Sequence, residues 1–208
     1  MRENKPQPAS RWALALLAVL AAPLARAELL DEPSVEQLIA RLSAPALAAP
    51  ADTGPYSKSL SFRPAAPPDP LTHRCDPKRA AKHAYGRNLV PYSTQAPSVD
   101  LALRFELGSD RLSAPDQRLL ERLALAMQSD ALRAELFAIA GHTDATGSRA
   151  INEPLSCARA LAAREYLIAL GIAAERLDAY GFGSERPIEN RIESAANRRV
   201  EIRRGLNH

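Results

Sequence analysis

The distribution of proline limits how this chain can fold, because it divides the sequence into two kinds of segment. Eleven of the 17 prolines lie between residues 28 and 98, including the stretch PAAPPDP at 64–70. Proline at this density blocks helix interiors and central strands. We therefore expect residues 28–98 to form an extended, semi-rigid tether, and residues 99–208 to form the folded domain.

One short stretch inside the tether has a helical pattern. In SVEQLIARL, residues 34–42, Ser34 is suited to cap a helix that presents Leu38, Ile39 and Leu42 on one face. A helix of this length is not stable alone in water. Three alternatives therefore stay open for it: docking on the folded domain, docking on a partner protein, or fluctuating without a partner.

The first 27 residues have the composition of a cleaved signal peptide. Arg2, Lys5 and Arg11 form a basic leader, an apolar run follows at 12–25, and small residues at 25–27 suit signal peptidase. The apolar run contains a proline and is shorter than the roughly 20 residues that a spanning helix needs. We therefore expect export to the periplasm and, since no cysteine follows the cleavage point, no lipid attachment there.

Charge and cysteine content narrow the partners and the compartment. The chain has 27 basic and 24 acidic residues, and removing residues 1–27 leaves 23 of each. A chain without net charge gives no reason to expect nucleic acid or anionic membranes as partners. Cys75 and Cys157 would reach an oxidising compartment, where a disulfide persists, but their spacing does not show whether they pair.

Residues 99–208 contain six periodic segments. Strands are predicted for 99–107, 135–142, 176–183 and 198–204, and helices for 113–129 and 154–170. Ser113 is the expected cap of the first helix, and Gly171 is expected to end the second. The order predicts an α+β fold, a β-α-β-α-β-β sandwich with both helices on one face of a small mixed sheet. Because Val200 and Ile202 alternate with charges, the last segment has the pattern of an edge strand.

The segment GHTDATGSRAINEPLSCARA, residues 141–160, carries a candidate binding site. Asp144 follows a buried strand among turn-forming residues, where an aspartate commonly folds back on loop amides. If Asn152 caps the next helix, Arg159 lies on the same face and leans back toward the helix start. The two charges would then bind a ligand head that carries both an ammonium and a carboxylate group. The alternative is that Asp144 and Arg159 form a structural salt bridge with each other.

This segment, together with YGFGSERP and NRRVEI further along, closely resembles the C-terminal domain family shared by OmpA proteins, peptidoglycan-associated lipoproteins and flagellar stator proteins. The resemblance runs from about Val99 to Arg203. It implies the β-α-β-α-β-β fold and noncovalent, noncatalytic binding of peptidoglycan through the diaminopimelate residue of the stem peptide. The residues that it implies for that ligand are Asp144, Arg159, Thr143, Asn152, Leu155, Ser156, Asn197 and Arg199.

The sequence departs from the family pattern at two places. Ala158 stands where many members have a first arginine, although the binding position, Arg159, is kept. The run from Asn190 to Asn197 is about two residues shorter than usual, which affects the expectation for Asn197 and Arg199 more than that for Asp144.

Two other classes of function have less support. An enzyme would have to use His142 beside Asp144, and a metal site would have to use His73, Cys75 and His83, which lack a fourth ligand at a familiar spacing. We therefore expect no catalysis and no cofactor. An envelope adaptor that holds another protein through Leu38, Ile39 and Leu42 or through the rest of the tether is compatible with wall binding and stays open as the alternative function.

Overall fold

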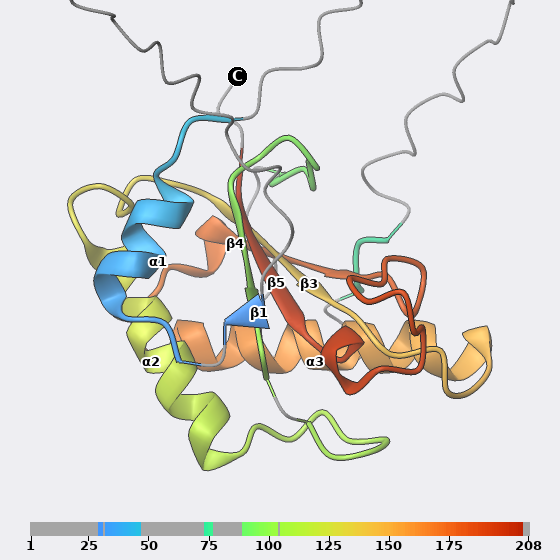
Figure 1. Cartoon of the computed structure of the whole chain (residues 1–208). Coiled ribbons are helices and arrows are strands. Elements are labelled where there is room, and N and C mark those ends of the chain that lie inside the picture. Colours follow the sequence, from blue (N-terminus) through green and yellow to red (C-terminus); the bar gives the residue numbers. More distant parts are fainter. Residues whose placement is uncertain (1–28, 31, 47–72, 77–88, 104, 206–208) are drawn as a thin grey trace, which may run out of the picture.

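The computed structural model describes residues 29–30, 32–46, 73–76, 89–103 and 105–205, so the predicted signal peptide lies outside the described residues. A five-stranded mixed sheet in the order β1-β2-β5-β3-β4 forms the centre of the fold (Figure 1). Its strands are β1 (Leu29–Leu30), β2 (Ser98–Leu101), β3 (Phe137–Gly141), β4 (Leu177–Gly181) and β5 (Val200–Arg204). β1 runs parallel to β2 and β3 runs parallel to β4, whereas β5 is antiparallel to both of its neighbours.

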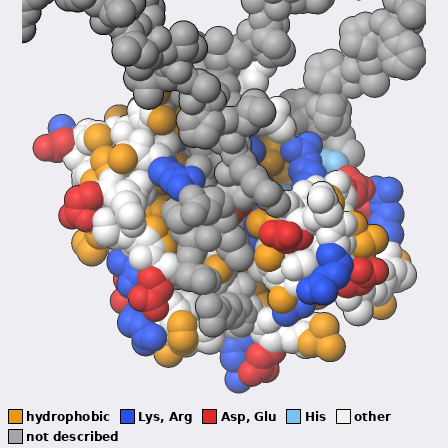
Figure 2. Space-filling view, viewed as in Figure 1, with side chains coloured by type: hydrophobic (Ala, Val, Ile, Leu, Met, Phe, Trp, Pro, Cys, Tyr) orange, Lys and Arg blue, Asp and Glu red, His pale blue; other side chains and the backbone are white. Residues whose placement is uncertain are grey.

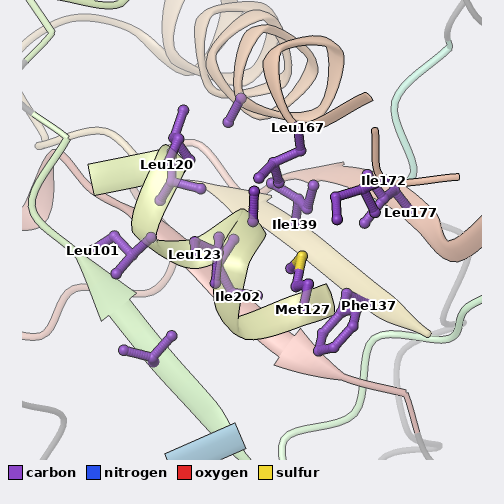
Figure 3. Close-up of a cluster of buried hydrophobic side chains, with 14 of the residues drawn as sticks. Leu101, Leu120, Leu123, Met127, Phe137, Ile139, Leu167, Ile172, Leu177 and Ile202 are labelled. Carbon is purple, nitrogen blue, oxygen red and sulfur yellow. The ribbon is translucent and has the colours of Figure 1, made fainter. Parts of the chain in front are cut away.

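Three helices cover one face of this sheet: α1 (Val35–Leu42), α2 (Ala114–Gln128) and α3 (Arg149–Ala169). Their apolar side chains meet those of the strands in one core (Figure 3). Leu120, Leu123 and Met127 of α2 are buried there, as the helical spacing predicts. From β2 onward the elements follow the order β-α-β-α-β-β, and the predicted α+β sandwich is confirmed.

The observed helix ends agree with the capping residues predicted from the sequence at two positions and differ at a third. Ser113 caps α2 in a capping box with Asp116, and Gly171 ends α3 with a positive φ of 93°, as predicted. α3, however, begins at Arg149 after Ser148, so the prediction that Asn152 is its cap is wrong. Pro154 lies inside the helix, where it removes one backbone N–H but leaves the preceding turn intact.

The position of β5 also differs from the prediction. β5 is the last strand in the chain, but it lies between β2 and β3 and is not an edge strand. Glu201 and Arg203 alternate with the core residues Val200 and Ile202, but they do not face solvent, since Glu201 is 2% exposed. The alternation of charge along β5 therefore reflects a second buried face.

The segment Leu89–Pro97 covers that second face. Tyr92 donates a hydrogen bond to Glu201 over 2.9 Å, and Nη1 of Arg203 donates to the carbonyl oxygens of Ser93, Thr94 and Ala96. The Tyr180 hydroxyl donates to the Val90 carbonyl oxygen. These contacts make residues 89–97 a third layer of the fold.

Helix α1 docks on the folded domain, which decides among the three alternatives for it. Leu38 and Leu42 are fully buried in the core that α1 shares with α2, and Ser34 caps the helix as predicted. The apolar face of α1 is therefore not available to a partner protein. The described parts of residues 28–98 pack on the domain, so an extended tether does not describe them.

Residues 73–76 are attached to the outer edge of β4. The Cys75 backbone N–H donates to the carbonyl oxygen of Ala179, and the Gly181 N–H donates to that of His73. A disulfide joins Cys75 to Cys157 of α3, with the Cα atoms 5.5 Å apart. The two cysteines, whose pairing the sequence left open, are therefore linked to each other across the sheet edge.

The described part of the chain contains no helix long and apolar enough to cross a bilayer. Acidic and basic side chains are interspersed over the face seen in Figure 2, in agreement with the balanced charge of residues 28–208.

Candidate functional site

The candidate residues gather at one end of the sheet, where β3 and β4 end and β5 begins (Figure 1). The loop after β3 leads directly into α3, which lies unusually close to the strand ends. A Cβ atom on Gly141 would lie 2.0 Å from the carbonyl oxygen of Ser156, and one on Gly181 would lie 2.6 Å from Sγ of Cys157. Glycine at these two positions lets the third turn of α3 pack directly on the ends of β3 and β4.

Asp144 lies in the loop after β3 and is 4% exposed. Its Oδ1 accepts a hydrogen bond from the Thr146 N–H over 3.0 Å, so the predicted bond to a loop amide is present. Its Oδ2 accepts from Nη1 of Arg198 over 2.6 Å. Burial opposes ionisation of this carboxyl group, but the hydrogen bonds from Arg198 and Thr146 outweigh it and lower its pKa. Asp144 is therefore a buried carboxylate at neutral pH.

Arg159 projects from α3 and is 1% exposed. Its Nε donates to the Ser109 carbonyl oxygen over 3.0 Å and its Nη2 to that of Glu106 over 3.2 Å, in the loop before α2. The guanidinium carbon lies 5.0 Å from the centre of the Phe105 ring. Within the described part of the chain, Nη1 is buried without a hydrogen-bond partner. Nε and Nη2 of this guanidinium are thus held by backbone carbonyl groups, and Nη1 is left to donate to another acceptor.

Asp144 and Arg159 are close enough to interact electrostatically, but the ion pair of Asp144 is with Arg198. Burial lowers the pKa of Arg159, and the charge of Arg198 lowers it further, whereas Asp144 and Asp110 act in the opposite direction. The alternative of a structural salt bridge between Asp144 and Arg159 therefore does not describe this structure. Sequence reasoning missed Arg198, because an edge strand at 198–204 would not have placed it beside the loop after β3.

Four further predicted residues lie in the same loop and helix start. Asn152 donates from Nδ2 to the carbonyl oxygen of Asp144 over 3.2 Å, so it holds the loop and does not cap the helix. Ser156 accepts from the Gly183 N–H over 2.9 Å. Leu155 is half-buried, and Oγ1 of Thr143 is buried without a hydrogen-bond partner among the described residues. Thr143 and Arg159 thus each have an unused polar atom.

Asn197 and Arg199 lie beside Arg198, but their side chains bond within the protein. Asn197 accepts from the N–H groups of Ile188 and Glu189 and donates to the carbonyl oxygens of Arg191 and Ile192. It therefore organises the shortened loop. Arg199 pairs with Asp100 of β2 over 2.5 Å and also donates to the Arg186 carbonyl oxygen. These contacts hold Arg198 in place from both sides.

His142, considered above as a catalytic group, belongs to a buried cluster. Its Nε2 lies 3.1 Å from Oε2 of Glu201, and burial lowers the pKa of His142 to about 4. The pKa of Glu201 is lowered to about 2, because hydrogen bonding by His142 and the charge of Arg203 outweigh the effect of burial. Cys75 is bonded to Cys157 and so provides no thiolate for a metal.

Comparison with known proteins finds a family model and several relatives that are similar to part of this chain. The OmpA family model matches residues 104–201. The chain is 46% identical over 67 residues to the peptidoglycan-binding protein ArfA of Mycobacterium tuberculosis, covering 31% of this chain and 21% of ArfA. It is 33% identical over 101 residues to the peptidoglycan-associated lipoprotein of Mesorhizobium japonicum, covering 48% of this chain and 59% of that protein.

Among solved structures, the peptidoglycan-associated lipoprotein of Burkholderia pseudomallei is similar over 49% of this chain and 87% of its own, with 28% identity and a TM-score of 0.44. The chain spans only part of its curated relatives, about a fifth of ArfA and 59% of the Mesorhizobium lipoprotein. The match to the family model includes β3, β4, the loop that carries Asp144, helix α3 with Arg159, and Arg198 before β5. Residues 104–201 of this chain are therefore similar in sequence to the OmpA family.

Proposed function

We propose that this protein binds peptidoglycan noncovalently through the diaminopimelate residue of the stem peptide, and that it anchors the cell envelope to the wall. The observation that carries the proposal is the presence of a carboxylate in the loop after β3 and of an incompletely bonded guanidinium on α3, which act on each other electrostatically. Asp144 provides a buried carboxylate, and Arg159 provides a buried guanidinium with one unbonded nitrogen. A zwitterionic head group would complement both.

The chemistry of the site favours such a ligand. An ammonium group on the ligand would take the place of Arg198 at Asp144, where burial strengthens charge-assisted hydrogen bonds. A carboxylate on the ligand would accept from Nη1 of Arg159, and the Thr143 hydroxyl would add a further polar contact. In this proposal Asn152, Ser156 and Asn197 hold the loops, Arg199 fixes the start of β5, and Leu155 lines the helix side of the site.

The names of the relatives support the same polymer, since ArfA is a peptidoglycan-binding protein and the Mesorhizobium protein is peptidoglycan-associated. Neither name is that of an enzyme, in keeping with a noncatalytic role. The predicted signal peptide would export this chain to the periplasm. There, many stem peptides on one polymer would retain the protein even if each contact were weak. The adaptor alternative loses its main support, because α1 buries Leu38 and Leu42 against the domain.

The test is cosedimentation of the purified full-length chain with isolated cell-wall sacculi. Asp144→Ala and Arg159→Ala should each raise the apparent Kd for the sacculi at least tenfold, because each removes one charge-assisted bond worth roughly 1.5 to 3 kcal/mol. Asp130→Ala and Arg133→Ala are matched controls: they pair with each other, are largely exposed, and precede the opposite end of β3. They should leave binding unchanged.

Circular dichroism shows whether each variant is folded. Folded Asp144→Ala and Arg159→Ala proteins that still sediment as the wild type does would show that the ligand binds elsewhere. Release of soluble muropeptides from the sacculi during the incubation would instead contradict the noncatalytic role.

A further inference from the structure

We propose that Arg198 determines the specificity of this site by occupying Asp144 until a ligand supplies both an ammonium and a carboxylate. The inference rests on the function proposed above and assigns a role to a residue outside the predicted set. Arg198 is the partly exposed member of the pair: its side chain is 32% exposed, whereas that of Asp144 is 6% exposed. The cation therefore lies toward solvent from the buried carboxylate.

An incoming ammonium group has to displace this guanidinium, because both use Oδ2 of Asp144. The distance of 2.6 Å between Nη1 and Oδ2 is that of a charge-assisted hydrogen bond. A ligand with an ammonium alone would exchange one cation for another and gain little. It would also leave Arg198 without its carboxylate partner.

The displaced guanidinium would be unfavourable next to Arg159. The charge of Arg198 already disfavours ionisation of Arg159, and Asp144 and Asp110 counteract this. The guanidinium groups of Arg159 and Arg198 and the carboxylate of Asp144 together carry a net charge of +1, and the other carboxylate that acts on Arg159, that of Asp110, is exposed to solvent. A ligand carboxylate near the two arginines would compensate this excess and give Arg198 a new partner. The site thus favours an ammonium that is accompanied by a carboxylate.

The surrounding structure limits the change to the Arg198 side chain. Its backbone N–H donates to the Ala195 carbonyl oxygen at the end of the short helical turn Ala195–Asn197. Asn197 before it makes four hydrogen bonds to the loop, and Arg199 after it is buried and paired with Asp100. Neither neighbour has to move when the Arg198 guanidinium leaves Asp144.

The test uses two soluble stem tripeptides that differ only at the third residue. One carries meso-diaminopimelate, and the other carries lysine, which has the side-chain ammonium without the adjacent carboxylate. Binding of each to the full-length chain is measured by titration calorimetry or by chemical-shift changes. The wild type should prefer the diaminopimelate peptide. Arg198→Met should reduce this preference about tenfold, mainly by strengthening binding of the lysine peptide, whereas Arg198→Lys should retain much of it.

Arg133→Met is the matched control, since it removes an exposed arginine that pairs with Asp130, and it should not change the ratio. A purely structural Asp144–Arg198 pair predicts lower stability of Arg198→Met with the same preference, and that result would overturn the inference. If the diaminopimelate peptide binds and Asp144→Asn weakens it, the proposed function stands whatever Arg198 does. If the wild type binds neither peptide, both the proposed function and the role of Arg198 are wrong.

Discussion

The buried pair of His142 and Glu201 makes the stability of the domain depend on pH between about 7 and 5. His142 is fully buried, and its Nε2 lies 3.1 Å from Glu201, which also accepts from the Tyr92 hydroxyl and contacts the Arg203 guanidinium. The change to test is His142→Gln. A glutamine amide donates a hydrogen bond to Glu201 as the imidazole does, but it does not titrate in this range.

The sign follows from the pKa of His142 in the two states. Its pKa falls from 6.5 to about 4 in the folded protein because burial disfavours the imidazolium. Above pH 6.5 the histidine is neutral in both states, and it has no effect on stability through proton binding. As the pH falls below 6.5, the unfolded chain takes up a proton that the folded chain does not, so the free energy of unfolding decreases. The loss is complete near pH 4.

The shift corresponds to about 2 kcal/mol of lost stability between pH 7 and pH 5, and to about 3 kcal/mol by pH 4. The pKa of Glu201 changes from 4.5 to about 2, so the loss from that residue falls mainly below pH 4.5. The interval from pH 7 to pH 5 therefore isolates His142 from this carboxylate.

Urea denaturation followed by circular dichroism at pH 7, 6 and 5 measures the effect. The wild type should lose about 2 kcal/mol more than His142→Gln over this interval, whatever the absolute stability of the variant. Equal pH slopes for the two proteins would show that His142 is not held neutral by burial. A wild type that becomes more stable on acidification would show that the imidazolium is the favoured form in the fold.

Two further predictions concern the contacts of α3. Replacing Cys75 and Cys157 by serine should destabilise the protein by up to about 4.5 kcal/mol, because the disulfide closes a separation of 82 residues; urea denaturation measures this, and added reductant should shift the wild type but not the double variant. Gly141→Ala should cost about 3 kcal/mol, since its Cβ would lie 2.0 Å from the Ser156 carbonyl oxygen. Gly108→Ala should cost only about 1 kcal/mol, because a Cβ atom there would have no neighbour within 4 Å and only the φ of 69° opposes it. Similar losses of stability for the two variants would show that close packing of α3 is not the cause of the loss at Gly141.

The sequence predicted the parts of the fold that depend on local signals. Apolar periodicity indicated the helices and strands from residue 98 onward, and Ser34, Ser113 and Gly171 marked helix ends. The first strand was predicted too long, because β2 ends at Leu101 and not at residue 107. The role of Asp144 and Arg159 in one binding site stays a prediction. The prediction that Asn152 caps helix α3 failed because Pro154 was taken to lie in the first turn. Pro154 is in fact the sixth residue of α3, and the local sequence pattern does not distinguish the two positions.

The errors that involve tertiary structure have a common origin. Alternating charge along β5 indicates solvent exposure, yet Glu201 is buried by a network that includes Tyr92 and Arg203. The residue pattern alone does not distinguish a charged side chain that is exposed to solvent from one that is buried in an ion pair beneath another segment of the chain. With β5 taken as an edge strand, Arg198 had no predicted neighbour, and residues 89–97 had no predicted role. The central position of β5 explains both omissions.

This position of β5 also sets an order of events during synthesis. β2 and β3 do not pair with each other; each pairs with β5, which is made after the other four strands of the sheet. Until Val200–Arg204 has been delivered, β2 has no antiparallel partner and the sheet remains in two pieces. A product that stops before residue 200 therefore cannot close the core, and it would present unpaired strand edges to proteases and to other chains. Folding of this domain thus has to wait for its last strand.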